Sequence, residues 1–323
     1  MLLAAVDSSL RLGVDLGGTK TEAVVLRLER DEPEVLARLR SPTNRDAGYD
    51  HVVAATAKVI FDVTVQAGLS SAPPVGVGMP GSVTYLRADG TRSDSPLTKN
   101  SNATVLNGRP FRSDLARALG RRISFANDAN CFAVAEATYG AARDARVAFG
   151  VIMGTGVGGG IVFRTHDGTS PAAAPIAWDG MQGIAGEWGH VALDPVQGPP
   201  CYCGRRGCVE TYLSGPAIEL SYARRTGTQR SLLEIANRAD TDVDAKTTLD
   251  ATMDVFGRAI ATVIKVLDPD TVVLGGGVSN LAALYEGGLD AVARWIFNDE
   301  VRTKIVKHSL GDSAGVIGAA LLP

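Results

Sequence analysis

The sequence predicts an α/β protein with two domains, and three observations support this fold class. Apolar strand-like segments alternate with amphipathic helical segments along the chain, as in α/β architectures. The length of 323 residues corresponds to about two domains at roughly 150 residues per domain. Two glycine-rich segments of similar layout lie about 137 residues apart, measured from Gly13 to Gly150, which indicates a weak internal repeat.

Both glycine-rich segments are predicted to be β-hairpins. Residues 12–26 (LGVDLGGTKTEAVVL) and 149–163 (FGVIMGTGVGGGIVF) each contain an apolar strand, a turn of glycine and threonine, and a second apolar strand. One interpretation is that the two hairpins are unrelated. The other is that two similar domains each present one hairpin to a shared cleft.

Periodicity, caps and turn residues predict the remaining elements. Apolar residues between Met253 and Leu267 fall on one face of a helix, and Asp268-Pro269 ends it. The other predicted elements are a strand over 271–274 followed by three glycines, a helix beginning at the capping box Ser231–Glu234, a helix over 112–119, a strand over 122–125, and a helix from the Asn127-Asp128 region to about Tyr139.

The composition excludes several classes of protein. Lys and Arg total 32 and Asp and Glu total 35, so a net charge of −3 argues against a basic nucleic-acid-binding surface. Hydrophobic residues make up 45% and charged residues 21%, which is typical of a globular chain. No apolar run reaches the roughly 20 residues of a membrane span, and residues 1–10 lack the basic region of a signal peptide. We therefore expect a cytoplasmic protein with no nucleic-acid or membrane partner.

The glycine turns are candidate phosphate-binding segments, because glycine lets backbone N–H groups approach an anion without a Cβ in the way. The candidate nucleotide-binding residues are Gly17, Gly18, Thr19 and Lys20 in the first turn, Gly154, Thr155 and Gly156 in the second, and Gly275 and Gly276, with Gly277, where an adenosine could lie. The glycine segments do not support a P-loop or a Rossmann nucleotide site. Asp15 precedes the first turn by two residues, and it either helps to hold Mg²⁺ or stabilises the hairpin turn.

Asp128 is predicted at a switch from strand to helix. An ionised carboxylate at this place could accept the proton of an alcohol during phosphoryl transfer. Asn and Asp are also preferred as helix N-caps, and spacing alone favours this structural interpretation.

The segment from residue 186 to 210 predicts a structural zinc site. Cys201, Cys203 and Cys208 supply three thiolates with C-x-C-x₄-C spacing, and His190 is the best candidate for the fourth ligand of a closed tetrahedral site. The alternative is three free thiols in a loop, which is unusual at this density. Glu187 and Glu210 flank the segment and could bind vicinal hydroxyls or be ordinary surface acids.

These motifs together resemble the ROK family of sugar kinases and repressors, over nearly the whole chain and in the family's order. The motifs are VDLGGTK at 14–20, MPGS at 79–82, NDAN at 127–130, GTGVGGG at 154–160, GEWGH at 186–190, CYCGRRGCVE at 201–210 and LGGGVSN at 274–280. Within the family, the segment 99–111, the PCYCG segment and the C-terminal segment from His308 are most similar to bacterial fructokinases, also called manno(fructo)kinases. N-acetylglucosamine kinases are the next most similar.

The resemblance implies an actin-like ATPase (ribonuclease H-like) fold, with two α/β domains around a cleft. The small domain would comprise residues 1–125, completed by a C-terminal helix in 306–323, and the large domain residues 126–305 with a zinc loop at 186–210. The implied activity is ATP- and Mg²⁺-dependent phosphorylation of a hexose hydroxyl, at C6 of fructose or of mannose. N-acetylglucosamine kinase and glucokinase remain alternatives, as does a non-catalytic sugar sensor, and a homodimer is common in the family. A repressor is disfavoured, because the twelve residues before Gly13 cannot form a helix-turn-helix.

The resemblance also implies residue roles. Asp128 would be the general base, and Asn127 and Gly81 would lie beside it on the sugar. Glu187, His190 and Glu210 would bind the remaining hydroxyls, with His190 also a zinc ligand. The role of Lys20 stays open.

Overall fold

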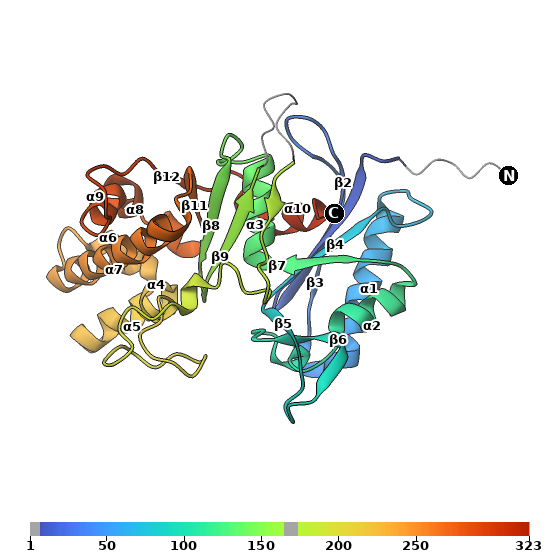
Figure 1. Cartoon of the computed structure of the whole chain (residues 1–323), viewed down its shortest axis with the longest axis horizontal. Helices are drawn as coiled ribbons and strands as arrows, with labels where there is room; N and C mark the ends of the chain where they lie inside the picture. The colour runs from blue at the N-terminus through green and yellow to red at the C-terminus, as the bar shows by residue number, and fades with distance from the viewer. Residues whose placement is uncertain (1–6, 165–173, 323) are drawn as a thin grey trace. The chain divides into compact units, whose positions relative to one another are not determined.

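The computed structural model describes residues 7–164 and 174–322 (Figure 1). The chain divides into two compact units. Unit 1 comprises Met1–Ala135, Ala177–Ile184 and Asp312–Pro323, and unit 2 comprises Glu136–Ile176 and Ala185–Gly311. The predicted partition into domains of 1–125 with 306–323 and of 126–305 stays a prediction.

Unit 1 is built on a five-stranded mixed sheet with strand order β3-β2-β1-β4-β7. The strands are β1 (Leu10–Leu16), β2 (Lys20–Arg27), β3 (Glu34–Pro42), β4 (Val75–Met79) and β7 (Ser124–Asn127), and the helices are α1 (Tyr49–Gln66), α2 (Phe111–Leu119) and α10 (Ala314–Ala320). Strands β1 and β2 pair antiparallel, which confirms the first predicted hairpin, whereas β4 runs parallel to β1 and β7 parallel to β4. A separate two-stranded ribbon pairs β5 (Ser82–Leu86) with β6 (Arg92–Lys99).

The period of two along β1 separates its two faces. Leu12, Val14 and Leu16 are fully buried in one hydrophobic core, together with residues of α1 and α2. The opposite face carries Gly13, where an added Cβ would lie 2.1 Å from the carbonyl oxygen of Val316. Helix α10 therefore packs directly on the backbone of β1, on the face that also carries Asp15.

Unit 2 repeats this layout with the order β10-β9-β8-β11-β12. Its strands are β8 (Val147–Met153), β9 (Val157–Phe163), β10 (Ile176–Ala177), β11 (Thr271–Gly275) and β12 (Lys304–Lys307), and its helices are α4 (Glu210–Leu213), α5 (Gly215–Thr226), α6 (Leu232–Arg238), α7 (Val243–Leu267), α8 (Ala283–Glu286) and α9 (Gly288–Ala293). Strands β8 and β9 form the second predicted hairpin, and β11 runs parallel to β8 just as β4 runs parallel to β1. The shared topology supports the interpretation of two similar α/β units over two unrelated hairpins.

The predicted helix ends and caps are confirmed in unit 2. Helix α7 ends at Leu267, and Asp268 follows in the left-handed conformation with φ of 48°. Ser231 and Glu234 form the predicted capping box of α6. In unit 1 the predicted strand over 122–125 is shifted, because β7 runs to Asn127 in register with β4 and α3 (Asp128–Thr138) begins at the next residue. The predicted end of this helix near Tyr139 agrees with the structure to within one residue.

None of the helices in the described ranges combines the length and the apolar character that a membrane span requires.

Candidate functional site

The first glycine turn is held by a threonine from the end of the neighbouring strand. The Gly17 N–H donates to the Lys20 carbonyl (2.9 Å), and the Thr43 hydroxyl donates to the Gly17 carbonyl (2.8 Å). The Thr43 N–H donates to the Thr19 carbonyl (2.9 Å). A Cβ at Gly17 would lie 2.8 Å from the Lys20 oxygen, so this turn requires glycine. The turn presents main chain in a fixed geometry, as a phosphate-binding segment requires.

The second glycine turn is tied to Glu210. The Val157 N–H donates to the Glu210 carboxylate (2.9 Å), and a Cβ at Gly156 would lie 2.7 Å from the same oxygen. The Gly215 N–H donates to the Gly154 carbonyl (2.8 Å), which joins the turn to the start of α5. A predicted sugar-binding residue therefore lies directly beside a predicted phosphate-binding turn.

The glycines after β11 lie against the end of β8. Gly275 is the last residue of β11, and Gly276 follows with φ of +79°. A Cβ at Gly276 would lie 2.4 Å from the Met153 carbonyl, immediately before Gly154. The second and third predicted nucleotide-binding segments are therefore neighbours.

Asp128 is the first residue of α3, at the strand-to-helix switch that the sequence predicts. The Ala129 N–H donates to the carboxylate of Asp128 (2.8 Å) and to the side-chain oxygen of Asn127 (2.9 Å). The Asn127 amide in turn donates to the Gly81 carbonyl (3.0 Å). Burial raises the pKa of Asp128 above its usual range, and the hydrogen bond from Ala129 opposes the shift. The structure thus brings Gly81, Asn127 and Asp128 together.

Asp15 shares this environment in unit 1. Burial raises the pKa of Asp15 most, the charges of Asp128 and Glu22 add to the shift, and Lys20 opposes it, so that the pKa lies at about 6. The carboxylate lies against α10, where a Cβ at Gly315 would be 3.2 Å from it. Oxygen ligands suit Mg²⁺, and a nearby cation would relieve the repulsion between the two carboxylates, so the surroundings of Asp15 fit a magnesium ion.

We expect the Asp15 carboxyl to make the stability of the protein depend on pH. Between pH 4 and pH 6 the native state binds more protons than the unfolded state, so the free energy of unfolding falls as the pH rises. The variant Asp15→Asn should lose this slope and, above pH 6, be more stable than the wild type by up to about 3 kcal/mol. Urea unfolding from pH 4.5 to 7.5 without Mg²⁺ measures both effects. Asp46→Asn is the control, because this side chain is fully exposed; an unchanged slope in Asp15→Asn would contradict the assignment.

Sequence reasoning missed a buried ion-pair cluster around Glu22. Glu22 is only 2% exposed, and its carboxylate lies 2.9 Å from Arg40 Nε, 3.4 Å from Arg38 Nε and 3.8 Å from Lys20 Nζ. The β1–β2 register places Glu22 opposite Asp15, and the β2–β3 register places it opposite Arg40. Only the alternation of charges in β2 and β3 could have indicated this contact. In the structure, Lys20 therefore pairs with Glu22.

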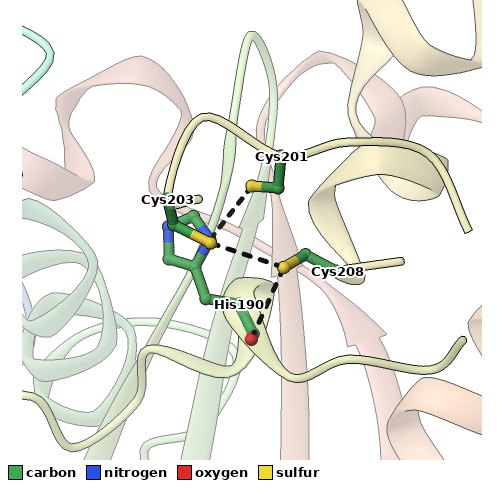
Figure 2. A group of neighbouring side chains, drawn as sticks. All are labelled: His190, Cys201, Cys203 and Cys208. Carbon is green, nitrogen blue, oxygen red and sulfur yellow. Dashed lines mark hydrogen bonds between the residues drawn. The ribbon is translucent and has the colours of Figure 1, made fainter. Parts of the chain in front are cut away.

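The four predicted metal ligands form one cluster (Figure 2). The ligand atoms of His190, Cys201, Cys203 and Cys208 all lie within 4.8 Å of one another. Cys201 Sγ is 3.6 Å from His190 Nδ1, and Cys203 Sγ is 3.6 Å from Cys208 Sγ. Tetrahedral zinc with Zn–S bonds of about 2.3 Å requires S···S separations of about 3.8 Å. The cluster therefore fits a four-coordinate zinc ion without an open position.

The glycines of β9 hold the loop that carries Glu187. Gly186 has φ of +90°, and a Cβ there would lie 2.2 Å from the Gly159 carbonyl. The Trp188 indole donates to the Gly158 carbonyl (3.1 Å). Glu187 is the N-cap residue of the 3-10 helix Trp188–His190, and the His190 N–H donates to its carbonyl (3.1 Å). The close approach of two backbones thus positions Glu187 beside the histidine ligand.

The predicted site residues fall into two groups, each within one unit. Unit 1 contains Asp15, the first glycine turn, Gly81, Asn127 and Asp128. Unit 2 contains the second glycine turn, Gly275 and Gly276, Glu187, Glu210 and the four metal ligands.

Comparisons with known proteins identify the family. The model of the ROK family matches residues 11–323. The N-acetyl-D-glucosamine kinase of Photobacterium profundum is 35% identical over 323 residues, covering 96% of this chain and 98% of the relative. That of Vibrio cholerae serotype O1 is 33% identical over 324 residues, covering 96% and 98%.

Solved structures show the same fold. The ROK hexokinase from Thermus thermophilus superposes with a TM-score of 0.79 at 29% identity, covering 97% of each chain. The ROK family glucokinase from Streptomyces griseus, in complex with glucose and AMPPNP, gives 0.73 at 25% identity, covering 97% of this chain and 99% of the other. The expected actin-like ATPase fold is confirmed.

The comparisons correct one detail of the resemblance. The curated relatives named above are N-acetyl-D-glucosamine kinases, so the predicted special similarity to fructokinases is not supported. That similarity rested on the segment 99–111, the PCYCG segment and the C-terminal segment from His308, which together are short compared with a match over 96% of the chain. With the family model covering residues 11–323 and relatives more than 30% identical over nearly its full length, the chain belongs to the ROK family.

Proposed function

We propose that this protein is an ATP-dependent sugar kinase that phosphorylates N-acetyl-D-glucosamine, with Asp128 as the general base. The observation that carries the proposal is that Asn127 and Asp128 both accept a hydrogen bond from the Ala129 N–H at the start of α3, in a chain 35% identical to an N-acetyl-D-glucosamine kinase. The fructose preference expected from the sequence has no comparable support.

The proposed reaction is an in-line phosphoryl transfer to a sugar hydroxyl, at C6 by the family resemblance. The two glycine turns would hold the triphosphate through main-chain N–H groups, and Gly275 and Gly276 would lie against the adenosine. The sugar oxygen forms a bond to the γ-phosphorus while the bond from phosphorus to the β,γ-bridging oxygen breaks and ADP leaves. Asp128 accepts the proton of the attacking hydroxyl. Mg²⁺, held in part by Asp15, would neutralise phosphate charge when bound.

The remaining polar residues would orient the sugar. Asn127 is fixed by Gly81 and Ala129, so its amide is held in one orientation beside the base. Glu187, His190 and Glu210 would bind further sugar oxygens. We also propose that His190 and the three cysteines hold a structural zinc ion, which would keep Glu187 and Glu210 in place at the two ends of the loop.

Glucose is the second candidate substrate, because the Streptomyces griseus relative, a glucokinase at 25% identity, was solved with glucose. The test is a panel of N-acetylglucosamine, N-acetylmannosamine, glucose, mannose and fructose with ATP, compared by kcat/KM in a coupled ADP-release assay. We expect N-acetylglucosamine to exceed each other sugar at least about tenfold, a difference of about 1.4 kcal/mol in transition-state binding. NMR of the product checks phosphorylation at C6. A higher kcat/KM for glucose or fructose would overturn the substrate, and no turnover with any sugar would favour the sensor alternative.

A further inference from the structure

The segment that follows β3 brings an arginine, Arg45, to the first glycine turn. Two residues before it, the buried Thr43 is tied to the turn through the hydrogen bonds to Gly17 and Thr19 described above. Asn44 then adopts the left-handed conformation, with φ of 48° and ψ of 44°, which is uncommon for a residue with a side chain. The short 3-10 helix Arg45–Ala47 begins at the next residue, so its start is fixed relative to the turn.

The guanidinium of Arg45 lies directly beside Gly18. A Cβ added at Gly18 would be 3.3 Å from Arg45 Nη1 and 3.4 Å from Asn102 Oδ1. Arg45 Nη1 also donates a hydrogen bond to the main-chain carbonyl of Asn102 (3.0 Å), which lies 57 residues further along the chain. All three residues belong to unit 1. The guanidinium is therefore held between the glycine turn and the segment that contains Asn102.

Most of the N–H groups of Arg45 remain available for a ligand. A guanidinium has five N–H donors, and the bond to Asn102 uses one of them. Within residues 7–164 and 174–322, its other polar partner is Asp46, whose Oδ1 is 4.0 Å from Nε and so beyond hydrogen-bonding distance. The Asp46 side chain is fully exposed, and water screens this pair. A cation with several free donors thus lies at the turn proposed to bind phosphate.

We infer that Arg45 is a catalytic residue whose guanidinium donates hydrogen bonds to oxygens of the transferred phosphoryl group. The inference rests on the function proposed above, in which the first glycine turn holds part of the triphosphate. The planar guanidinium can contact two phosphate oxygens at once. The negative charge of the transferred group is spread over its three equatorial oxygens, so a fixed cation there stabilises the transition state. The bond to Asn102 holds the cation in place before the nucleotide binds.

The first test is Arg45→Met, with Arg117→Met as the matched control. Arg117 is an exposed arginine of α2 in the same unit, and it pairs only with Asp114. In Arg45→Met we expect kcat with N-acetylglucosamine to fall at least about tenfold and the KM for this sugar to stay within about twofold of the wild type. The control should change neither value. Arg45→Lys keeps the charge and a donor for Asn102, and it should recover part of the lost kcat. An unchanged kcat in Arg45→Met, or a rise in the KM for sugar alone, would overturn the inference, since the latter result assigns Arg45 to the support of the Asn102 segment.

The second test uses ADP with aluminium fluoride, an anion that takes the place of the transferred phosphoryl group. Titration calorimetry with Mg²⁺ and N-acetylglucosamine present gives the Kd for ADP with and without aluminium fluoride. We expect ADP alone to bind wild type and Arg45→Met equally within about twofold, because ADP lacks that group. Aluminium fluoride should tighten ADP binding at least about tenfold in the wild type and less than about threefold in Arg45→Met.

The two tests separate this inference from the proposed function. Equal tightening in wild type and Arg45→Met, or no tightening in the wild type, would overturn the role of Arg45 in a protein that still phosphorylates sugar. Wild-type protein that phosphorylates none of the sugars in the panel would instead overturn the proposed function.

Discussion

The variant Asp128→Asn is expected to lose about a thousandfold in kcat while it stays folded. General-base catalysis contributes about 10²- to 10⁴-fold, and an amide cannot accept the proton of the attacking hydroxyl. The side-chain oxygen of asparagine can still accept the hydrogen bond that the Ala129 N–H donates to Asp128. We therefore expect the start of α3 to be preserved and the KM for sugar to change little. Single-turnover and steady-state assays with N-acetylglucosamine measure the loss.

The matched control is Asp114→Asn, a carboxylate in the first turn of α2 in the same unit. Asp114 accepts a hydrogen bond from the Tyr49 hydroxyl and has no place in the proposed reaction. Circular dichroism should show wild-type spectra for both variants, and only Asp128→Asn should lose turnover. A wild-type kcat in Asp128→Asn would remove the general-base assignment and return Asp128 to the role of a helix cap.

Local patterns in the sequence were sufficient for the hairpins and the metal cluster. An apolar strand, a glycine turn and a second apolar strand specify a hairpin within about fifteen residues, because alternation and turn chemistry act between near neighbours. The spacing of Cys201, Cys203 and Cys208 similarly confines three thiolates to one short loop. Both features could therefore be predicted without knowledge of the rest of the fold.

Contacts between distant segments could not be predicted in this way. Glu136 is fully buried at the end of α3 and accepts hydrogen bonds from the N–H groups of Ser309 and Leu310, more than 170 residues away. Glu22 meets Arg40 only through the register of β2 with β3. Neither contact follows from a motif, because each depends on which segments the fold places side by side.

Neither the local sequence patterns nor the contacts between distant segments identify the sugar that the protein binds. Asn127, Glu187, His190 and Glu210 are polar groups that could serve the hydroxyls of any hexose, so the same motifs accompany kinases of different specificity. The fructokinase interpretation rested on three short segments, whereas relatives across 96% of the chain are N-acetyl-D-glucosamine kinases.

The second large effect is expected from Cys208→Ser, which removes one ligand of the metal cluster. Cys208 is fully buried, and its sulfur lies 3.6 Å from Cys203 Sγ. A structural zinc site needs all four ligands, and its binding free energy contributes to folding. We expect the variant to lose most of its zinc and to melt at a lower temperature than the wild type. Metal analysis and differential scanning fluorimetry measure the two effects.

The loss of zinc should weaken the binding of the sugar and leave the binding of the nucleotide nearly unchanged. The ligands enclose residues 190–208, while Glu187 precedes this loop by three residues and Glu210 follows it by two, so release of the loop loosens the backbone next to both carboxylates. The second glycine turn is also held by β8 and β9, which contain no ligand. We therefore expect the KM for N-acetylglucosamine to rise at least about tenfold, or 1.4 kcal/mol, and the KM for ATP to change by less than about threefold. Cys131→Ala is the control, since Cys131 is buried outside the cluster and should retain the metal. If protein verified as zinc-free keeps the wild-type KM for sugar, the loop is held by its own packing, and the metal has no part in positioning Glu187 and Glu210.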